Sequence, residues 1–277
     1  MTTTQSNPGS HSGLYQGIDE LTVALHDGVL SVTLNRPDSL NSLTAAMLST
    51  IASAMERAAT DPGVRVVRFG GAGRGFSSGA GISAEDHANP GASGTPDDVL
   101  AAANQAVRSI VALPKPVVAV VQGPAAGVGV SLALACDIIL ASEKAYFLLA
   151  FTKIGLMPDG GASALVAASI GRARAMKLAL LAERLPAAEA LAAGLVSAVH
   201  PADELDAAVD TVIATLASGP AVALRKSKQA INAATLTELE AAFERETEGQ
   251  LTLLVSDDFR EGTKAFQQRR SPTFTDD

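Results

Sequence analysis

The sequence predicts an α/β protein, on the strength of two observations. Short β-branched apolar runs alternate with segments whose apolar residues recur every three or four positions, as far as about His200. From Pro201 onward every segment has the helical pattern. Because strands that alternate with helices pack as layers, we expect repeated ββα units followed by a helical appendage. We therefore divide the chain into a flexible leader at residues 1–14, a core at 15–200 and a helical region at 201–277.

The composition excludes several classes of function. The chain has 277 residues, of which 47% are hydrophobic, so it can bury a large core. Its formal net charge of −8 argues against nonspecific nucleic-acid binding. No apolar run approaches the roughly 20 residues that span a bilayer, and the polar first residues lack a signal-peptide pattern, so we expect a cytoplasmic protein that does not bind membranes. The single cysteine, Cys136, excludes an internal disulfide and a cysteine-based zinc site, and we expect no metal.

The first elements are a hairpin, a helix and a strand. Residues 21–26 and 29–34 are apolar and β-branched, and Asp27-Gly28 between them is a strong hairpin signal. Leu43, Met47, Ile51 and Met55 recur at every fourth position, which predicts an amphipathic helix. A strand follows at 64–69. The later strands are expected at 116–121, 138–141, 145–149 and 195–200, and the later helices at 99–113, 130–136, 162–170, 172–181, 187–193, 203–216, 220–233, 236–254 and 258–268.

The stretch from Lys115 to Ile139 is a strand that leads through glycines into an apolar helix. The first N–H groups of a helix have no partner within it, and the helix dipole places partial positive charge there. No side chain in this stretch ionises before Asp137 apart from an apolar Cys136, which we expect to be a buried, inert thiol. A functional role would therefore depend on backbone N–H groups directed at a developing oxyanion. The alternative is a tightly packed strand–turn–helix without a function.

A second glycine-rich segment spans residues 70–82. It is too long for a simple turn, and Phe76 within it is suited to anchor the segment to a core. Residues 79–84 match the G-x-G-x-x-A pattern of dinucleotide-binding proteins. That match is discounted, because it lies well past the strand end and the acidic residue expected after a second strand is missing.

Three segments together resemble the enoyl-CoA hydratase/isomerase (crotonase) superfamily. They are LNRP with LNSL at residues 34–43, GAGRGFSSGA at 71–80, and GPAAGVG with LALACD at 123–137. The resemblance covers roughly residues 15–274. It implies a crotonase-like spiral of ββα turns with a C-terminal helical trimerisation region. It also implies an acyl-CoA thioester substrate, no cofactor beyond the coenzyme A of that substrate, and a homotrimer or dimer of trimers.

The resemblance also implies site residues. By position, the backbone N–H groups of Ala80 and Val128 would form the oxyanion hole. Ser78, Ala80, Gly81, Ile82, Ser83 and Val128 would lie along the substrate and its coenzyme A. The two glutamate positions of the family's hydratases hold Ser131 and Phe151 here, and neither side chain can activate water as a carboxylate would.

One carboxylate remains at a suitable position, Asp159 in the turn Pro158–Gly161. Isomerases of the family place an acidic residue at this turn, where it moves protons on the acyl chain. The alternative is that Asp159 caps the helix that begins near Gly161. Three functions follow: an enoyl-CoA isomerase using Asp159, a hydratase of fatty acid metabolism with a non-standard water activator, or a non-catalytic acyl-CoA binding protein. The missing glutamates favour the isomerase.

Overall fold

The computed structural model describes residues 15–80 and 95–275, whose strands form two sheets. The larger sheet has the order β1-β2-β3-β4-β6-β9, and the smaller one has the order β5-β7-β8. The strands of the larger sheet are β1 (Leu21–His26), β2 (Val29–Leu34), β3 (Val66–Gly71), β4 (Val117–Val121), β6 (Ile138–Ser142) and β9 (Ala198–His200). Those of the smaller sheet are β5 (Ala125–Ala126), β7 (Tyr146–Leu148) and β8 (Leu185–Pro186).

The larger sheet is antiparallel only at its first pair. β1 and β2 form the expected hairpin. Asp27 and Gly28 both have positive φ, as a two-residue type I′ turn requires. From β2 to β9 all neighbours run parallel. Every residue of β4 is buried, as expected for a central parallel strand covered on both faces.

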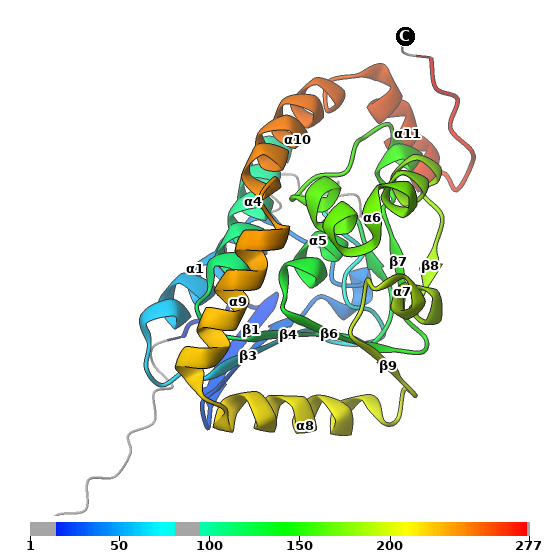
Figure 1. The fold of residues 1–277 in the computed structure, drawn as a ribbon. Coiled ribbons are helices and arrows are strands. Elements are labelled where there is room, and N and C mark those ends of the chain that lie inside the picture. The colour runs from blue at the N-terminus through cyan, green and yellow to red at the C-terminus, as the bar shows by residue number, and fades with distance from the viewer. Residues whose placement is uncertain (1–14, 81–94, 276–277) are drawn as a thin grey trace, which may run out of the picture.

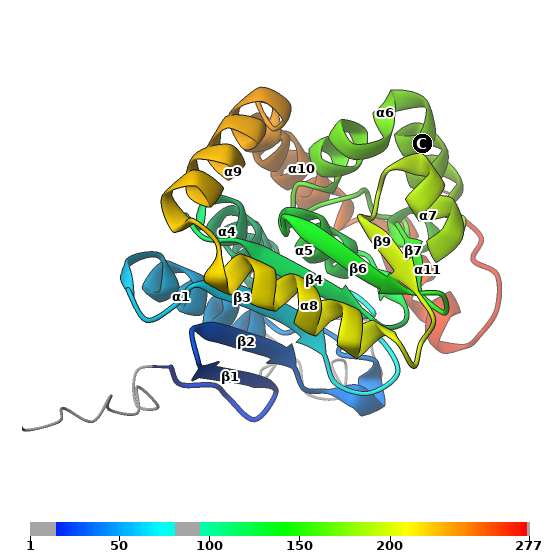
Figure 2. The same cartoon turned by 60° about the horizontal axis from the view of Figure 1, so that its bottom comes forward.

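Helices cover both faces of this sheet (Figures 1 and 2). In Figure 2, α8 crosses the near face, and α1, α4 and α5 lie behind the strands. The helices are α1 (Ala45–Thr60), α4 (Pro96–Ala112), α5 (Val128–Ala135), α6 (Ala162–Leu181), α7 (Ala187–Ala193), α8 (Leu205–Ser218), α9 (Ala221–Thr235), α10 (Leu239–Leu253) and α11 (Asp257–Gln267), with 3-10 turns at η1 (Pro37–Ser39) and η2 (Phe151–Ile154).

Two hydrophobic cores result from this layering. The larger core lies between the sheet and helices α1, α4 and α5, and contains Phe69 and Phe76, whose rings meet edge to face at 5.5 Å. The smaller core lies between the sheet and α8, where Val209 packs against strand residues such as Val118. Phe76 is fully buried, so the expectation that it anchors the glycine-rich segment is confirmed.

α6 is two helical segments joined at a kink, as the sequence predicts. Gly171 separates them with φ 77° and ψ 160°, which is outside the helical region. The division expected between 162–170 and 172–181 is therefore confirmed. Within the described part of the chain no single helix is long and apolar enough to cross a membrane; α8 and α9 reach that length only as a pair, and they are bent by 108°.

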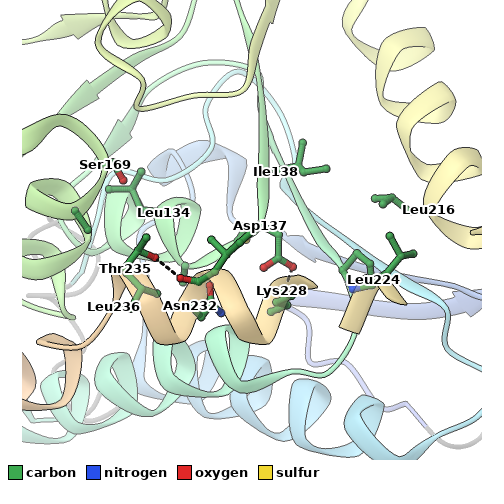
Figure 3. A pocket seen from close by; sticks show the side chains of 15 residues that line it. Leu134, Asp137, Ile138, Ser169, Leu216, Leu224, Lys228, Asn232, Thr235 and Leu236 are labelled. Carbon is green, nitrogen blue, oxygen red and sulfur yellow. Dashed lines mark hydrogen bonds and ion pairs between the residues drawn. The ribbon is translucent and has the colours of Figure 1, made fainter. Parts of the chain in front are cut away.

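None of the residues of α9 is buried, and polar contacts of Lys228 connect it to the core. Lys228 Nζ lies 2.9 Å from Asp137 Oδ2 and donates to the carbonyl oxygens of Ile110 and Lys115 at 3.1 and 3.2 Å. These groups lie beside a cavity of about 350 Å³ between α9 and the core, where Asp137 and Lys228 are neighbours (Figure 3). Cys136 also lines this cavity and is buried, as expected.

Candidate active site

The two glycine-bearing segments singled out in the sequence run side by side. Ser77 pairs with Ala125 of β5 in a parallel bridge, and its carbonyl oxygen accepts the Ala126 N–H at 2.8 Å. On the opposite side, Leu43 N–H donates to Gly79 O at 2.9 Å. The segment 77–80 therefore lies between residues 40–43 and β5, and it ends where α5 begins.

Gly79 and Gly127 are in direct contact, and both have positive φ, 91° and 53°. A Cβ on Gly127 would lie 3.6 Å from Gly79 Cα, and a Cβ on Gly79 would lie 2.9 Å from Ala126 O. Only glycine combines this backbone conformation with so close an approach of two chains. Ala80 and Val128, which follow these glycines directly, are consequently neighbours in space.

The orientation of the two amides follows from the hydrogen bonds of their own peptide groups. In a trans peptide the C=O and the next N–H point in opposite directions. Gly79 O faces Leu43, so the Ala80 N–H points away from Leu43. Gly127 O accepts from Val130 N–H within α5, so the Val128 N–H points out of the helix N-terminus. Among residues 15–80 and 95–275, neither N–H has a protein acceptor.

α5 begins at Val128, two residues before the start that its apolar pattern suggests, because Gly127 serves as its N-cap. All eight of its residues are buried. The Val128 N–H is therefore in the first turn, where helix N–H groups lack internal partners and the dipole is positive. A short, wholly buried helix places this positive end inside the protein, where charge interactions are screened less than at the surface.

Asp159 lies against the first turn of α5. Ser131 Oγ donates to Asp159 O at 2.9 Å, and a Cβ on the next residue, Gly160, would lie 3.8 Å from Val128 Cγ1. Gly160 and Gly161 both have positive φ, 64° and 77°, which makes the turn sharp. The turn that carries Asp159 thus packs against the same helix end that carries the Val128 amide.

The Asp159 carboxylate is almost completely buried, with 7% of the residue exposed. Its Oδ2 accepts a hydrogen bond of 2.6 Å from Gln250 Nε2, whereas its Oδ1 is buried and has no partner within residues 15–80 and 95–275. Burial raises the pKa of Asp159 to about 7, against a lowering by the Gln250 hydrogen bond and with a further increase from the nearby Glu246. A carboxyl group of this pKa can both accept and return a proton near neutral pH.

Glu246 of α10, and not Asp159, caps α6. Its two carboxylate oxygens accept the N–H groups of Gly161 and Ser163 at 2.6 and 2.8 Å. The alternative in which Asp159 is the helix cap is therefore wrong. Sequence reasoning missed both Glu246 and Gln250, whose partners lie 83 to 93 positions away in the chain. The only sequence feature that could have pointed to them is their four-residue spacing on one helix, and many solvated helices have the same spacing.

Ser131 and Phe151, which the resemblance placed at the expected glutamate positions, have uncharged side chains. Ser131 is fully buried, and its hydroxyl is already used by Asp159 O. Phe151 is also buried, and its ring lies 3.8 Å from the point where a Cβ on Gly127 would be. Of Ser131, Phe151 and Asp159, only Asp159 has a side chain that ionises.

Comparison with known proteins decides the family. The sequence pattern described as enoyl-CoA hydratase/isomerase matches residues 24–277. The chain belongs to the enoyl-CoA hydratase/isomerase family. It is 39% identical to 1,2-epoxyphenylacetyl-CoA isomerase of Escherichia coli over 90% of this chain and 95% of that protein. It is 38% identical to a probable enoyl-CoA hydratase of Rhodobacter capsulatus, over 91% and 96% of the two chains.

The fold agrees with this family. A crystal structure of an enoyl-CoA hydratase from Mycobacterium avium subsp. paratuberculosis has a TM-score of 0.88 and 67% identity to this chain, and covers 94% of this chain and all of that one. The expected crotonase fold is thereby confirmed. The isomerase and hydratase names among the relatives establish an acyl-CoA enzyme family without choosing between the two reactions.

The remaining site residues expected from the family lie in and just beyond the glycine-rich segment at residues 70–82. Ser78 is half-buried, its N–H donates to Leu40 O at 2.8 Å, and its hydroxyl donates to Ser39 O at 2.9 Å. Ser78 thus fixes the segment that carries Ala80. Gly81, Ile82 and Ser83 lie outside the described residues.

Proposed function

We propose that this protein is an enoyl-CoA isomerase, in which Asp159 transfers a proton along the acyl chain of a coenzyme A thioester. The observation that carries the proposal is the buried Asp159 Oδ1, which has no partner among the described residues and belongs to a turn whose next residue, Gly160, packs against Val128 at the start of α5. A buried carboxylate oxygen without a hydrogen bond is costly, so its retention points to a partner supplied by substrate.

The mechanism follows from these groups. The thioester carbonyl oxygen accepts hydrogen bonds from the Ala80 and Val128 N–H groups. Asp159 removes a proton from C2 of a 3-enoyl thioester, and the electron pair moves onto the carbonyl oxygen as a dienolate. Each fixed donor contributes about 3 to 4 kcal/mol to stabilising such an oxyanion. The same carboxyl group then returns its proton to C4, the double bond moves to C2–C3, and Asp159 is ionised again.

The uncharged Ser131 and Phe151 favour isomerisation over hydration. Adding water across a 2-enoyl thioester requires a group that positions and deprotonates a water molecule. Ser131 is occupied by its bond to Asp159 O, and Phe151 is apolar. A relative from Streptococcus mutans that is named trans-2-decenoyl-[acyl-carrier-protein] isomerase supports the same choice. Hydration with Asp159 as the water activator is the second candidate, which the hydratase names of other relatives favour.

The test is a panel of 3-enoyl-, 2-enoyl- and dienoyl-CoA thioesters, with products followed by mass and enoyl absorbance. We expect a 3-enoyl thioester to give a product of unchanged mass with the conjugated absorbance. A mass increase equal to one water from a 2-enoyl thioester, at a higher rate than isomerisation, would establish hydration instead. Tight binding of every thioester without turnover would establish a non-catalytic binding protein.

We also propose that the protein assembles as a trimer or a pair of trimers. Large apolar side chains remain exposed on the helical region and on α6, including Leu180 at 63%, Val222 at 63% and Val255 at 69%. Exposed apolar residues in such numbers are typical of surfaces that another subunit covers. Light scattering during size-exclusion chromatography should give three or six times the chain mass of 28.1 kDa, and a mass of 28.1 kDa would contradict the proposal.

A further inference from the structure

One face of α10 holds the turn that carries Asp159. A Cβ on Gly161 would lie 2.7 Å from Leu239 Cδ1 and 2.9 Å from Phe243 Cε1, and a Cβ on Gly249 would overlap Met157 Sδ. Both glycines are needed for this approach, because any side chain would push the turn and the helix apart. The turn therefore has little freedom to move relative to α10.

Gln250 is the polar centre of this contact. Its Oε1 accepts the Met157 N–H at 3.2 Å, and its Nε2 donates to Met157 O at 3.1 Å and to Asp159 Oδ2 at 2.6 Å. Only one orientation of the amide satisfies all three bonds, since the reverse would place Oε1 against two oxygens. Gln250 is 2% exposed, so water does not compete for these bonds.

We propose that Gln250 is a positioning residue for the proton transfer: it binds one oxygen of Asp159 so that the other, Oδ1, is the atom presented to the substrate. This inference rests on the proposed role of Asp159 as the proton-transferring group. Gln250 itself does not reach the substrate in this account, because all its polar atoms are used by Met157 and Asp159.

Gln250 also influences when Asp159 ionises. A donor to a carboxylate favours the charged form and lowers its pKa, whereas burial and the carboxylate of Glu246, one helical turn away on α10, raise it. From α5 the group facing this turn is the uncharged Ser131. Loss of the Gln250 donor leaves the two raising influences unopposed, so the pKa of Asp159 should move upward.

The experiment compares the pH dependence of isomerisation in the wild type, Gln250→Met, Gln250→Glu and the matched control Gln229→Met. Gln229 is exposed on α9, so its substitution should change nothing. For Gln250→Met we expect the rising limb of kcat to move to higher pH by about one pH unit, since a hydrogen bond to a charged group contributes roughly a tenfold effect or more. At neutral pH the shift alone lowers kcat about fivefold, kcat rises at high pH to a plateau below that of the wild type because Oδ1 is no longer held in place, and KM stays within about twofold of the wild type.

Gln250→Glu keeps an acceptor for Met157 N–H but places a second carboxyl group against Asp159. We expect it to fold and to move the limb further upward, because two adjacent carboxylates resist simultaneous ionisation. A uniform loss of kcat at every pH, with the limb unmoved in both variants, would show that Gln250 only supports the structure and would overturn the inference.

The two proposals fail in different ways. If Asp159→Asn retains wild-type turnover, Asp159 is not the proton-transferring group and the proposed function is wrong. If Asp159→Asn is inactive but both Gln250 variants keep the wild-type pH limb, the proposed function stands and the positioning role of Gln250 is wrong.

Discussion

Replacing Asp159 by asparagine should abolish turnover and at the same time stabilise the protein at alkaline pH. The substitution keeps an oxygen that can accept from Gln250 Nε2 but removes the ionisable group. Loss of a general acid–base residue lowers rates by about 100-fold to 10,000-fold. We expect kcat for 3-enoyl-CoA isomerisation to fall by at least about 1,000-fold, whereas thioester binding persists, since the amides of Ala80 and Val128 are unchanged.

The stability gain follows from linkage between protonation and folding. Burial raises the pKa of Asp159 from 3.8 to about 7, so the folded state holds this proton more tightly than the unfolded chain. The associated stability is fully present below pH 3.8 and is lost as the pH rises through about 7. A pKa difference of about 3 corresponds to about 4 kcal/mol as an upper bound. Between about pH 5.5 and about pH 8.5 the advantage of Asp159→Asn should grow by about 2 kcal/mol.

The assay is urea denaturation of the wild type, Asp159→Asn and the control Asp210→Asn at both pH values. Asp210 is exposed on α8, so its variant should follow the wild type at each pH. An advantage of Asp159→Asn that is the same at both pH values would refute the claim that this carboxyl group titrates near neutral pH in the folded protein.

Three further predictions concern the oxyanion donors, the helix cap and the α9 contact. Val128 is the first residue of α5, where proline is tolerated, so Val128→Pro should fold. It removes one N–H donor and should lower kcat by about 100-fold to 1,000-fold. The control Val128→Ala keeps the N–H, and an equal loss in that variant would show that the side chain is responsible. Glu246→Ala removes the acceptor of the buried Gly161 N–H and of the part-buried Ser163 N–H at the start of α6, and should cost about 3 kcal/mol in urea denaturation. A change below about 0.5 kcal/mol would contradict this cap. Lys228→Met leaves Asp137 without its cation and should lower the free energy of unfolding by about 3 kcal/mol. Adding Asp137→Asn should recover much of this loss, and the exposed control Lys226→Met should be neutral. No recovery in the double variant would show that the loss comes from packing.

The fold could be predicted from the sequence because its signals are local. The Asp27-Gly28 turn, the four-residue recurrence in α1 and the isolated Gly171 in α6 each specify the backbone near them. Differences arise at element ends. β3 runs to Gly71, past the apolar run, because backbone pairing with β2 continues through its glycines. α5 starts earlier than its apolar pattern because Gly127 supplies the cap.

The candidate site could be predicted only in part. The family resemblance pointed to Ala80, Val128 and Asp159, but local patterns did not decide whether Asp159 caps α6. That depended on Glu246, which lies 83 positions from Ser163 and reaches it only because α10 folds back over α6. Gln250 was missed for the same reason, since long-range side-chain contacts leave no periodic signal in a sequence.

The account depends on formation of an enolate held by two peptide amides, and exchange of the C2 protons of a 3-enoyl-CoA thioester in deuterated water measures that step directly. We predict rapid deuterium incorporation with the wild type and with Val128→Ala, and a loss of at least about 100-fold with Val128→Pro and with Asp159→Asn. Wild-type exchange rates in both of the latter variants would contradict the roles assigned to the Val128 amide and the Asp159 carboxylate.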